Sequence, residues 1–179
     1  MITLVIGNGP SSAAWIDLPR YTPTIGCNFA VKDFSLDHLV CVDRLAVHEV
    51  RKLSIPQYTK CWVKTSPLET PPGWSEFDIP GIDSGSAAIK LAGHLYEHTI
   101  FAVGFDGVLN NDNSNRYTYP YRNQRTPKNS RDRHRAACVE IHNQLGRVVF
   151  VNDTPDPELE TMSYVHARQA IESQLRKIS

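Results

Sequence analysis

The sequence predicts an α/β fold: a doubly wound, mostly parallel sheet of about six strands with helices on both faces, as in Rossmann-like domains. Short apolar segments alternate with amphipathic ones along the chain, the order expected of strands joined by crossover helices. Residues 39–42 and 148–151 are apolar at every position, as expected of strands covered on both faces. The length of 179 residues predicts a single domain.

Six segments predict strands, because each is a short apolar run between turn or capping residues. They are residues 3–6, 24–29, 39–42, 61–64, 100–103 and 147–151. Four segments predict helices, because their apolar residues recur at helical spacing. They are residues 44–53, 84–98, 133–145 and 162–178. Ser84 is the expected N-cap of the second helix, and Gly146 ends the third.

Two stretches predict irregular structure. Residues 65–80 contain four prolines, which interrupt helices and strands, and are expected to form a surface excursion. Residues 107–132 form a long loop after the fifth strand. A loop of that length within a domain is typically a lid or a flexible segment.

The composition limits the classes of partner. Lys and Arg number 19, and Asp and Glu also number 19, so no net charge draws the chain to nucleic acid or to an anionic membrane. No apolar run approaches the ~20 residues of a membrane span, and we expect a cytoplasmic protein. The four cysteines lack metal-binding spacing, which predicts buried, reduced thiols. A homo-oligomer remains open.

The first strand runs into a loop of small residues, which we call the glycine loop: Gly7, Asn8, Gly9, Pro10, Ser11 and Ser12. An apolar strand that ends in glycines and hydroxyls brings bare backbone N–H groups to a phosphate, so this loop predicts a nucleotide site. The third glycine of the dinucleotide fingerprint is missing, and Asn28 stands where an acid would bind a ribose. No Gly-Lys-Ser/Thr follows, which excludes a Walker A loop. The alternative interpretation of the glycine loop is a tight turn between a strand and a helix, with no ligand.

A second motif, Ser84-Gly85-Ser86, opens a predicted helix. Small residues there leave free N–H groups at the positive end of the helix dipole, which suits a phosphate or a carboxylate. The alternative is that Ser84 is simply a cap.

A third motif follows the strand at 100–103, where Gly104 leads to Asp106. A carboxylate at the carboxyl end of a parallel strand can bind a ribose, position a metal or act on a substrate hydroxyl. A turn-capping aspartate is the alternative. Asp43, after residues 39–42, is a weaker candidate of the same kind.

The basic segment, residues 116–135, carries seven Lys or Arg, one acidic residue and three tyrosines. Guanidinium groups beside aromatic rings suit phosphates and stacked bases, which predicts a nucleotide-closing lid or a patch for single-stranded nucleic acid. A solvated basic loop is the third interpretation. The arginines expected to meet phosphates are Arg116, Arg122 and Arg125. His134 is the histidine best placed for proton transfer, although an ordinary surface histidine fits the pattern too.

In their order along the chain, these motifs resemble the bacterial lipo-oligosaccharide sialyltransferases and, equally, the archaeal 6-hydroxymethylpterin diphosphokinase-like proteins, which share a Rossmann-like core. The matching segments are Gly-Asn-Gly-Pro-Ser in the glycine loop, Ile-Gly-Cys-Asn ending at Asn28, Ser-Gly at Ser84, and Val-Gly-Phe-Asp ending at Asp106. Short proteins with a similar glycine loop occur in bacteriophage genomes, so the chain resembles a short phage-type member.

The resemblance implies that Asn8 and Asn28 hold the nucleotide of a CMP-sugar and that Ser84 and Gly85 contact this donor. The sialyltransferases also use tyrosines and a histidine after the strand that matches 100–103, to stabilise the leaving phosphate and to act as general base. The candidates here are Tyr117, Tyr119, Tyr121 and His134. The chain is shorter than those transferases and lacks an evident acceptor-binding segment or membrane-anchoring tail.

We therefore expect a nucleotide-binding transferase, most favourably one that takes a small-molecule nucleotide sugar of the CMP type and an unidentified acceptor. In glycosyl transfer, His134 or Asp106 would take the acceptor proton. In diphosphoryl transfer, Asp106 would hold Mg²⁺. Non-catalytic binding of a nucleotide and nucleic-acid binding through residues 116–135 are the alternatives.

Overall fold

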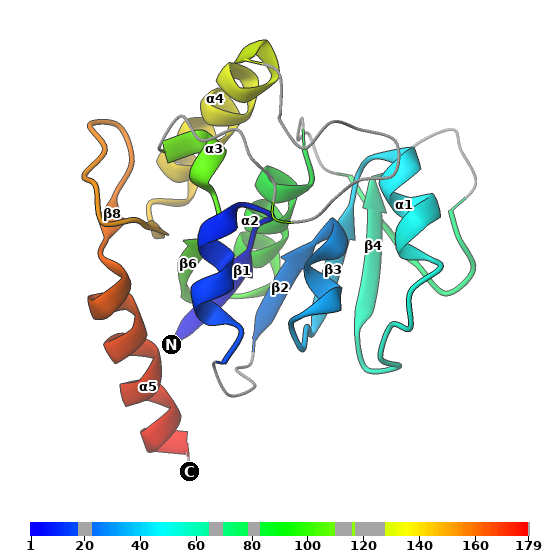
Figure 1. Ribbon diagram of the computed structural model, residues 1–179, viewed down its shortest axis with the longest axis horizontal. Coiled ribbons are helices and arrows are strands. Elements are labelled where there is room, and N and C mark those ends of the chain that lie inside the picture. Colours follow the sequence, from blue (N-terminus) through cyan, green and yellow to red (C-terminus); the bar gives the residue numbers. More distant parts are fainter. Residues whose placement is uncertain (18–22, 65–69, 79–82, 110–115, 117–127, 179) are drawn as a thin grey trace.

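A computed structural model describes residues 1–17, 23–64, 70–78, 83–109, 116 and 128–178. In this part of the chain, one sheet of eight strands has the order β5-β4-β3-β2-β1-β6-β7-β8 (Figure 1). Every neighbouring pair is parallel. The order reverses direction at β1, the arrangement of a doubly wound, Rossmann-like sheet.

The strands on one side of the reversal are β1 (Ile2–Ile6), β2 (Thr24–Cys27), β3 (His38–Cys41), β4 (Lys60–Lys64) and β5 (Ser75–Phe77). Those on the other side are β6 (Thr99–Val103), β7 (Val148–Val151) and β8 (Thr161–Met162). The α-helices are α1 (Arg44–Val50), α2 (Ser84–Leu95), α3 (Asp106–Leu109), α4 (Lys128–Leu145) and α5 (Tyr164–Ile178). Two 3₁₀ helices, η1 (Pro10–Trp15) and η2 (Asn28–Lys32), follow β1 and β2.

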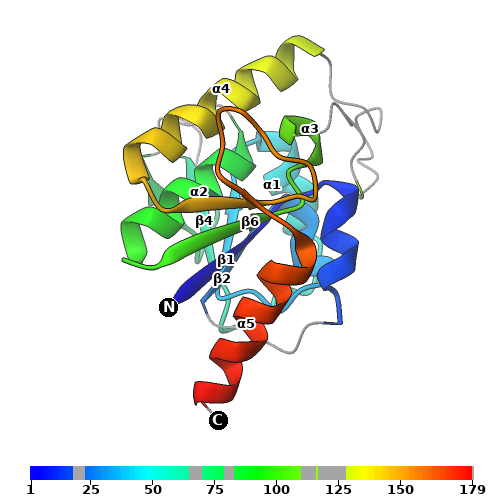
Figure 2. The ribbon, with the colours of Figure 1, turned by 90° about the vertical axis from the view of Figure 1, so that its left-hand side faces the viewer.

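Two hydrophobic cores lie on opposite faces of the sheet, because side chains alternate along each strand. Leu4 and Ile6 of β1 belong to one core, which η1, η2, α1 and α5 cover. Val5 belongs to the other, which α2 and α4 cover. Figure 2 shows α2 and α4 on one side of the strands and η1 and α5 on the other. The prediction of helices on both faces is confirmed.

The sheet has eight strands rather than about six. The two that the sequence did not predict are β5 and β8, with three and two residues. Both lie at the edges of the sheet. β5 falls in the proline-containing stretch 65–80, which was predicted to be irregular. An edge strand needs one pairing partner and little burial, so neither segment carries the apolar pattern of a central strand.

Other boundaries also differ from the prediction. Helix α4 begins at Lys128 and α3 occupies Asp106–Leu109, so both ends of the predicted loop 107–132 are helical. The second strand stops at Cys27 because Asn28 has a φ of +49°, which no strand residue adopts. All four cysteines are free and buried, as predicted, and burial raises the pKa of the Cys61 thiol to about 11.

Candidate functional site

The glycine loop meets the end of β6 at the point where the strand order reverses. In doubly wound sheets, ligands bind outside the carboxyl ends of the strands at this point. The Gly7 N–H donates to the carbonyl oxygen of Val103 at 2.7 Å, and the Gly9 N–H donates to that of Gly104 at 2.8 Å. The two segments that the sequence identified independently therefore lie against each other.

Close backbone contact requires glycine on both sides. A Cβ on Gly9 would lie 2.0 Å from Oδ2 of Asp106 and 2.7 Å from the Gly104 oxygen, and one on Gly7 would lie 2.4 Å from that oxygen. Gly104 itself has a φ of +76°, in the region that glycine adopts without strain. These glycines are explained by packing between loop and strand.

The expectation of bare N–H groups in this loop is wrong for most of them. The Gly7 and Gly9 N–H groups bind β6 and the residue that follows it, and the Ser12 N–H donates to the Gly9 oxygen at 3.1 Å. The Ser11 N–H donates to Oδ2 of Asp106, also at 3.1 Å. Pro10, which begins η1, has no N–H. A ligand at this loop must therefore be held largely by side chains.

Asp106 connects the loop to α3. Its Oδ2 accepts the Ser11 hydroxyl at 2.7 Å as well as the Ser11 N–H, and the residue is buried. Both bonds reach the glycine loop rather than the turn at Gly107. The Asp106 carboxylate therefore fixes the glycine loop through the N–H and the hydroxyl of Ser11, at the carboxyl edge of the sheet.

Asn28 and Ser84 are in direct contact, although 56 positions separate them in the sequence. The Ser84 hydroxyl donates to Oδ1 of Asn28 at 2.9 Å and accepts the Val42 N–H at 3.0 Å. Ser84 therefore positions Asn28, its own proton being already used. Among the described residues, the Asn28 side chain makes no other hydrogen bond, so its amide nitrogen keeps two N–H donors for a ligand.

The N-terminus of α2 does not offer the free N–H groups that were predicted. Asp83, rather than Ser84, is the N-cap. Its Oδ1 accepts the Gly85 and Ser86 N–H groups at 2.8 and 2.9 Å, and its Oδ2 accepts the Ser86 hydroxyl at 2.9 Å. A carboxylate already occupies this position, which disfavours a second anion there. Asp43 precedes α1 and is exposed; it makes no side-chain cap of that helix.

Arg116, the first residue of the basic segment, lies beside the glycine loop. Its backbone N–H donates to the carbonyl oxygen of Asn8 at 2.8 Å. Its guanidinium lies 2.8 Å from Oδ2 of Asp33 and over the ring of Phe34. Tyr117, Tyr119, Tyr121, Arg122 and Arg125 lie outside the described residues. The backbone of Arg116 therefore lies beside the glycine loop, and its guanidinium is paired with Asp33.

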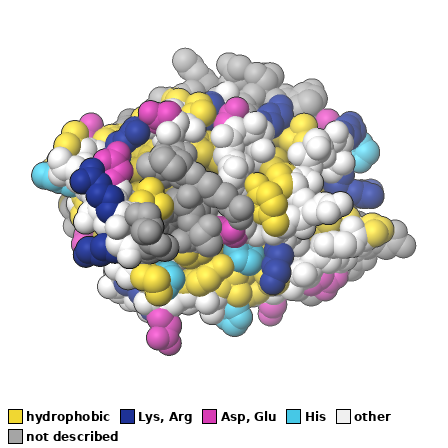
Figure 3. Space-filling view, turned by 90° about the horizontal axis from the view of Figure 1, so that it is seen from below, with side chains coloured by type: hydrophobic (Ala, Val, Ile, Leu, Met, Phe, Trp, Pro, Cys, Tyr) yellow, Lys and Arg dark blue, Asp and Glu magenta, His cyan; other side chains and the backbone are white. Residues whose placement is uncertain are grey.

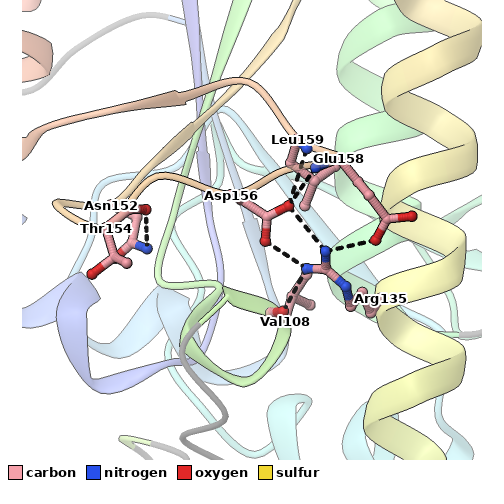
Figure 4. A network of polar contacts seen from close by, with 7 residues as sticks. All are labelled: Val108, Arg135, Asn152, Thr154, Asp156, Glu158 and Leu159. Carbon is pink, nitrogen blue, oxygen red and sulfur yellow. Dashed lines mark hydrogen bonds and ion pairs between the residues drawn. The ribbon is translucent and has the colours of Figure 1, made fainter.

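The other end of the basic segment binds carboxylates on the chain itself. Figure 4 shows Arg135 of α4 between the connection after β7 and the oxygen of Val108. Its two terminal nitrogens bind the Asp156 carboxylate at 2.8 and 2.9 Å, and one also binds Glu158 at 2.8 Å. Arg135 holds the pKa of Asp156 below its ordinary value of 3.8. His134 precedes Arg135 on α4, and no hydrogen bond or ion pair joins it to the glycine loop within the described residues.

Tyr164 is a candidate that the sequence did not reveal. It is the first residue of α5, and its backbone N–H donates to Oδ1 of Asp153, after β7, at 3.1 Å. Burial raises the pKa of its hydroxyl, the neighbouring Ser11 lowers it, and the nearby carboxylates Asp106 and Asp153 raise it. A lone tyrosine more than 150 positions from the glycine loop carries no local signal of this contact.

A different polar cluster lies at the opposite edge, where the strands begin. The indole N–H of Trp62 donates to Nδ1 of His38 at 3.0 Å, and Nε2 of His38 lies 2.9 Å from the Tyr96 hydroxyl. Because Nδ1 accepts, the neutral ring donates from Nε2. Burial lowers the pKa of His38. Figure 3, the view from this side, shows histidines beside hydrophobic side chains.

Within the described residues, no group of three or more His, Cys, Asp or Glu side chains is arranged to hold a metal ion. No helix in that part of the chain has the length and apolarity to cross a membrane. Comparison with known proteins found no matching family model, curated protein or solved structure.

Proposed function

We propose that the protein is a nucleotide-binding transferase whose donor, most favourably a CMP-type nucleotide sugar, binds at the carboxyl ends of β1, β2 and β6. The observation that carries this proposal is the hydrogen bond between Asn28 and Ser84. It joins two of the motifs on which the resemblance rests, and it fixes the amide oxygen of Asn28 while using none of the N–H donors of that amide.

The conformation of Asn28 supports the same conclusion. A φ of +49° is uncommon outside glycine and has a modest energetic cost, although asparagine tolerates it better than most residues. Here Ser84 holds the amide oxygen, so the nitrogen can donate to acceptors on a base or a ribose. The glycine loop and Asp106 would lie beside the donor at the strand-order reversal.

A nucleic-acid interface is less well supported. Of the basic residues that predicted it, Arg116, Arg131 and Arg135 each pair with a carboxylate on this chain. A paired guanidinium gains less from a phosphate, because the existing partner must be displaced. The nucleotide site is therefore preferred over a nucleic-acid patch.

The proposal is tested by thermal-shift and calorimetric titrations with CMP, a CMP-sugar, UDP-sugars, GTP, ATP with Mg²⁺, and NAD. A ligand at ~100 times its Kd stabilises the fold by about 2.7 kcal/mol. We expect CMP and the CMP-sugar to stabilise the protein, and a response to none of the nucleotides would refute the proposal. A response to ATP with Mg²⁺ instead would favour diphosphoryl transfer.

Asn28→Gly is the variant that tests the location of the site. Glycine accepts the positive φ, so this change removes the amide without adding backbone strain. We expect it to abolish the nucleotide response. Asn143→Ala, at an exposed position of α4, is the matched control and should respond like the wild type. A full response of Asn28→Gly would place the ligand elsewhere.

A further inference from the structure

Arg116 connects two segments that border the proposed nucleotide site. Its backbone N–H donates to the carbonyl oxygen of Asn8, in the glycine loop after β1, at 2.8 Å. Its guanidinium lies 2.8 Å from Oδ2 of Asp33, at the end of η2 after β2. One residue, distant from both in the sequence, therefore bonds to the connections that leave β1 and β2.

Helix η2 is bound at both ends by residues from elsewhere in the chain. Asn28 is its first residue, and the Ser84 hydroxyl donates to Oδ1 of Asn28 at 2.9 Å. Asp33 is its C-cap and is paired with Arg116. Phe29, between these ends, is buried in the core. The ion pair is thus placed to fix η2, and Asn28 with it, relative to the glycine loop.

The surroundings of the ion pair favour a fixed guanidinium. The side chain of Arg116 is 17% exposed and that of Asp33 is 31% exposed, so water and salt screen the pair less than they would at an open surface. The guanidinium also lies over the ring of Phe34, 5.7 Å from its centroid, a contact that suits its planar shape. Moving it to a phosphate would leave a half-buried carboxylate without this partner.

We propose that Arg116 is a positioning residue, which holds η2 and the glycine loop at the separation that a bound nucleotide requires and does not itself bind the phosphate. This inference rests on the proposed function, since it needs a nucleotide that contacts both segments. It gives Arg116 a different role from the phosphate contact that the sequence predicted. Two binding segments that are already in place lose less freedom when the ligand binds, so the ion pair contributes to affinity.

Arg116→Gln and Asp33→Ala test this role by removing the two partners of the ion pair separately. The probe is CMP, and its Kd is measured by calorimetry. We expect each variant to bind CMP about 10-fold more weakly, within the range by which residues without ligand contact change a coupling between sites. The double variant should bind no more weakly than either single variant, because both changes remove the same interaction.

Lys52→Gln is the matched control. It breaks an ion pair with Glu49, three positions away in the sequence, which joins no two distant segments. This variant should bind CMP like the wild type. Urea unfolding shows that each variant is folded under the conditions of the titration. If Asp33→Ala is not folded, Asp33→Asn replaces it, because asparagine keeps the shape of the side chain and removes the charge.

The direction of the change in Asp33→Ala separates positioning from a phosphate contact. If Arg116 binds the phosphate, Asp33 competes for the guanidinium, and its removal should tighten the binding of CMP. Tighter or unchanged CMP binding in the Asp33 variant would therefore overturn the positioning role. So would variants that unfold at lower urea concentration but keep the wild-type Kd, because the ion pair would then be structural only.

The wild type separates failure of this inference from failure of the proposed function. A wild-type protein that binds CMP, with Arg116 and Asp33 variants that bind it equally well, overturns the positioning role and leaves nucleotide binding intact. A wild-type protein that binds no CMP overturns the CMP-type donor and the positioning role with it.

Discussion

Arg135→Ala should destabilise the protein by about 2–3 kcal/mol. Breaking a buried ion pair by removing one partner costs about 3–5 kcal/mol. The side chain of Asp156 is 8% exposed, which places the pair near that range, but Arg135 is 25% exposed and Glu158 57% exposed. Asp156 also keeps two backbone N–H donors, from Glu158 and Leu159, which lowers the cost of leaving it without Arg135.

The change is measured by urea and thermal unfolding. For a chain of 179 residues, about 2–3 kcal/mol corresponds to a fall in Tm of about 4–12 °C. Arg131→Ala removes an ion pair with the exposed Asp132 and should cost under about 0.5 kcal/mol. If Arg135→Ala unfolds within about 0.5 kcal/mol of the wild type, the ion pair does not stabilise this connection and the reasoning is refuted.

The pH dependence gives a second measurement. The pKa of Asp156 in the folded protein lies below its ordinary value of 3.8, chiefly because Arg135 binds the carboxylate. Its contribution to stability is therefore present above 3.8 and is lost as the pH falls through the lowered pKa. We expect the difference in unfolding free energy between wild type and Arg135→Ala to narrow in that acid range. A constant difference would contradict this assignment.

Two further predictions concern the opposite edges of the sheet. Gly9→Ala would place a Cβ 2.0 Å from Oδ2 of Asp106, so we expect a loss of at least about 2 kcal/mol in urea unfolding; a wild-type midpoint would mean that the loop relaxes freely. Burial lowers the pKa of His38, so the unfolded chain binds more protons and the folded protein loses stability as the pH falls through 6.5. His38→Gln keeps groups that can bind Trp62 and Tyr96 but does not titrate; its Tm should fall less than that of the wild type between about pH 7.5 and pH 5.5, and an equal fall would exclude His38 as the cause.

The sequence was sufficient to predict the central strands and to place two of the motifs at strand ends. Residues 39–42 and 148–151 form central strands whose two faces are both covered. A strand of this kind is apolar at every position, so the uninterrupted apolar run is enough to predict it. The carboxyl ends of parallel strands lie at one edge of a sheet, which is why the glycine loop and Asp106, each expected directly after a strand, lie at the same edge.

What the sequence did not predict depends on contacts between distant residues. The glycine loop was expected to offer N–H groups to a phosphate, and β6 and Asp106 accept most of them instead. The N-cap of α2 is Asp83 and not Ser84 as predicted. Aspartate and serine are both favoured N-cap residues, so the sequence alone did not distinguish the two positions. Tyr164 lies near the glycine loop because α5 packs against the core. A single tyrosine at the start of a helix does not predict this packing.

The place of β1 between β2 and β6 also bears on the order of events during synthesis. Strands β1 to β5 can pair in sequence once residue 77 has emerged, but the second edge of β1 waits for residues 99–103. At about 5–20 residues per second, that interval lasts about 1–5 s. For that time a nascent chain presents an open, apolar strand edge in the middle of its future sheet, where another chain could pair with it.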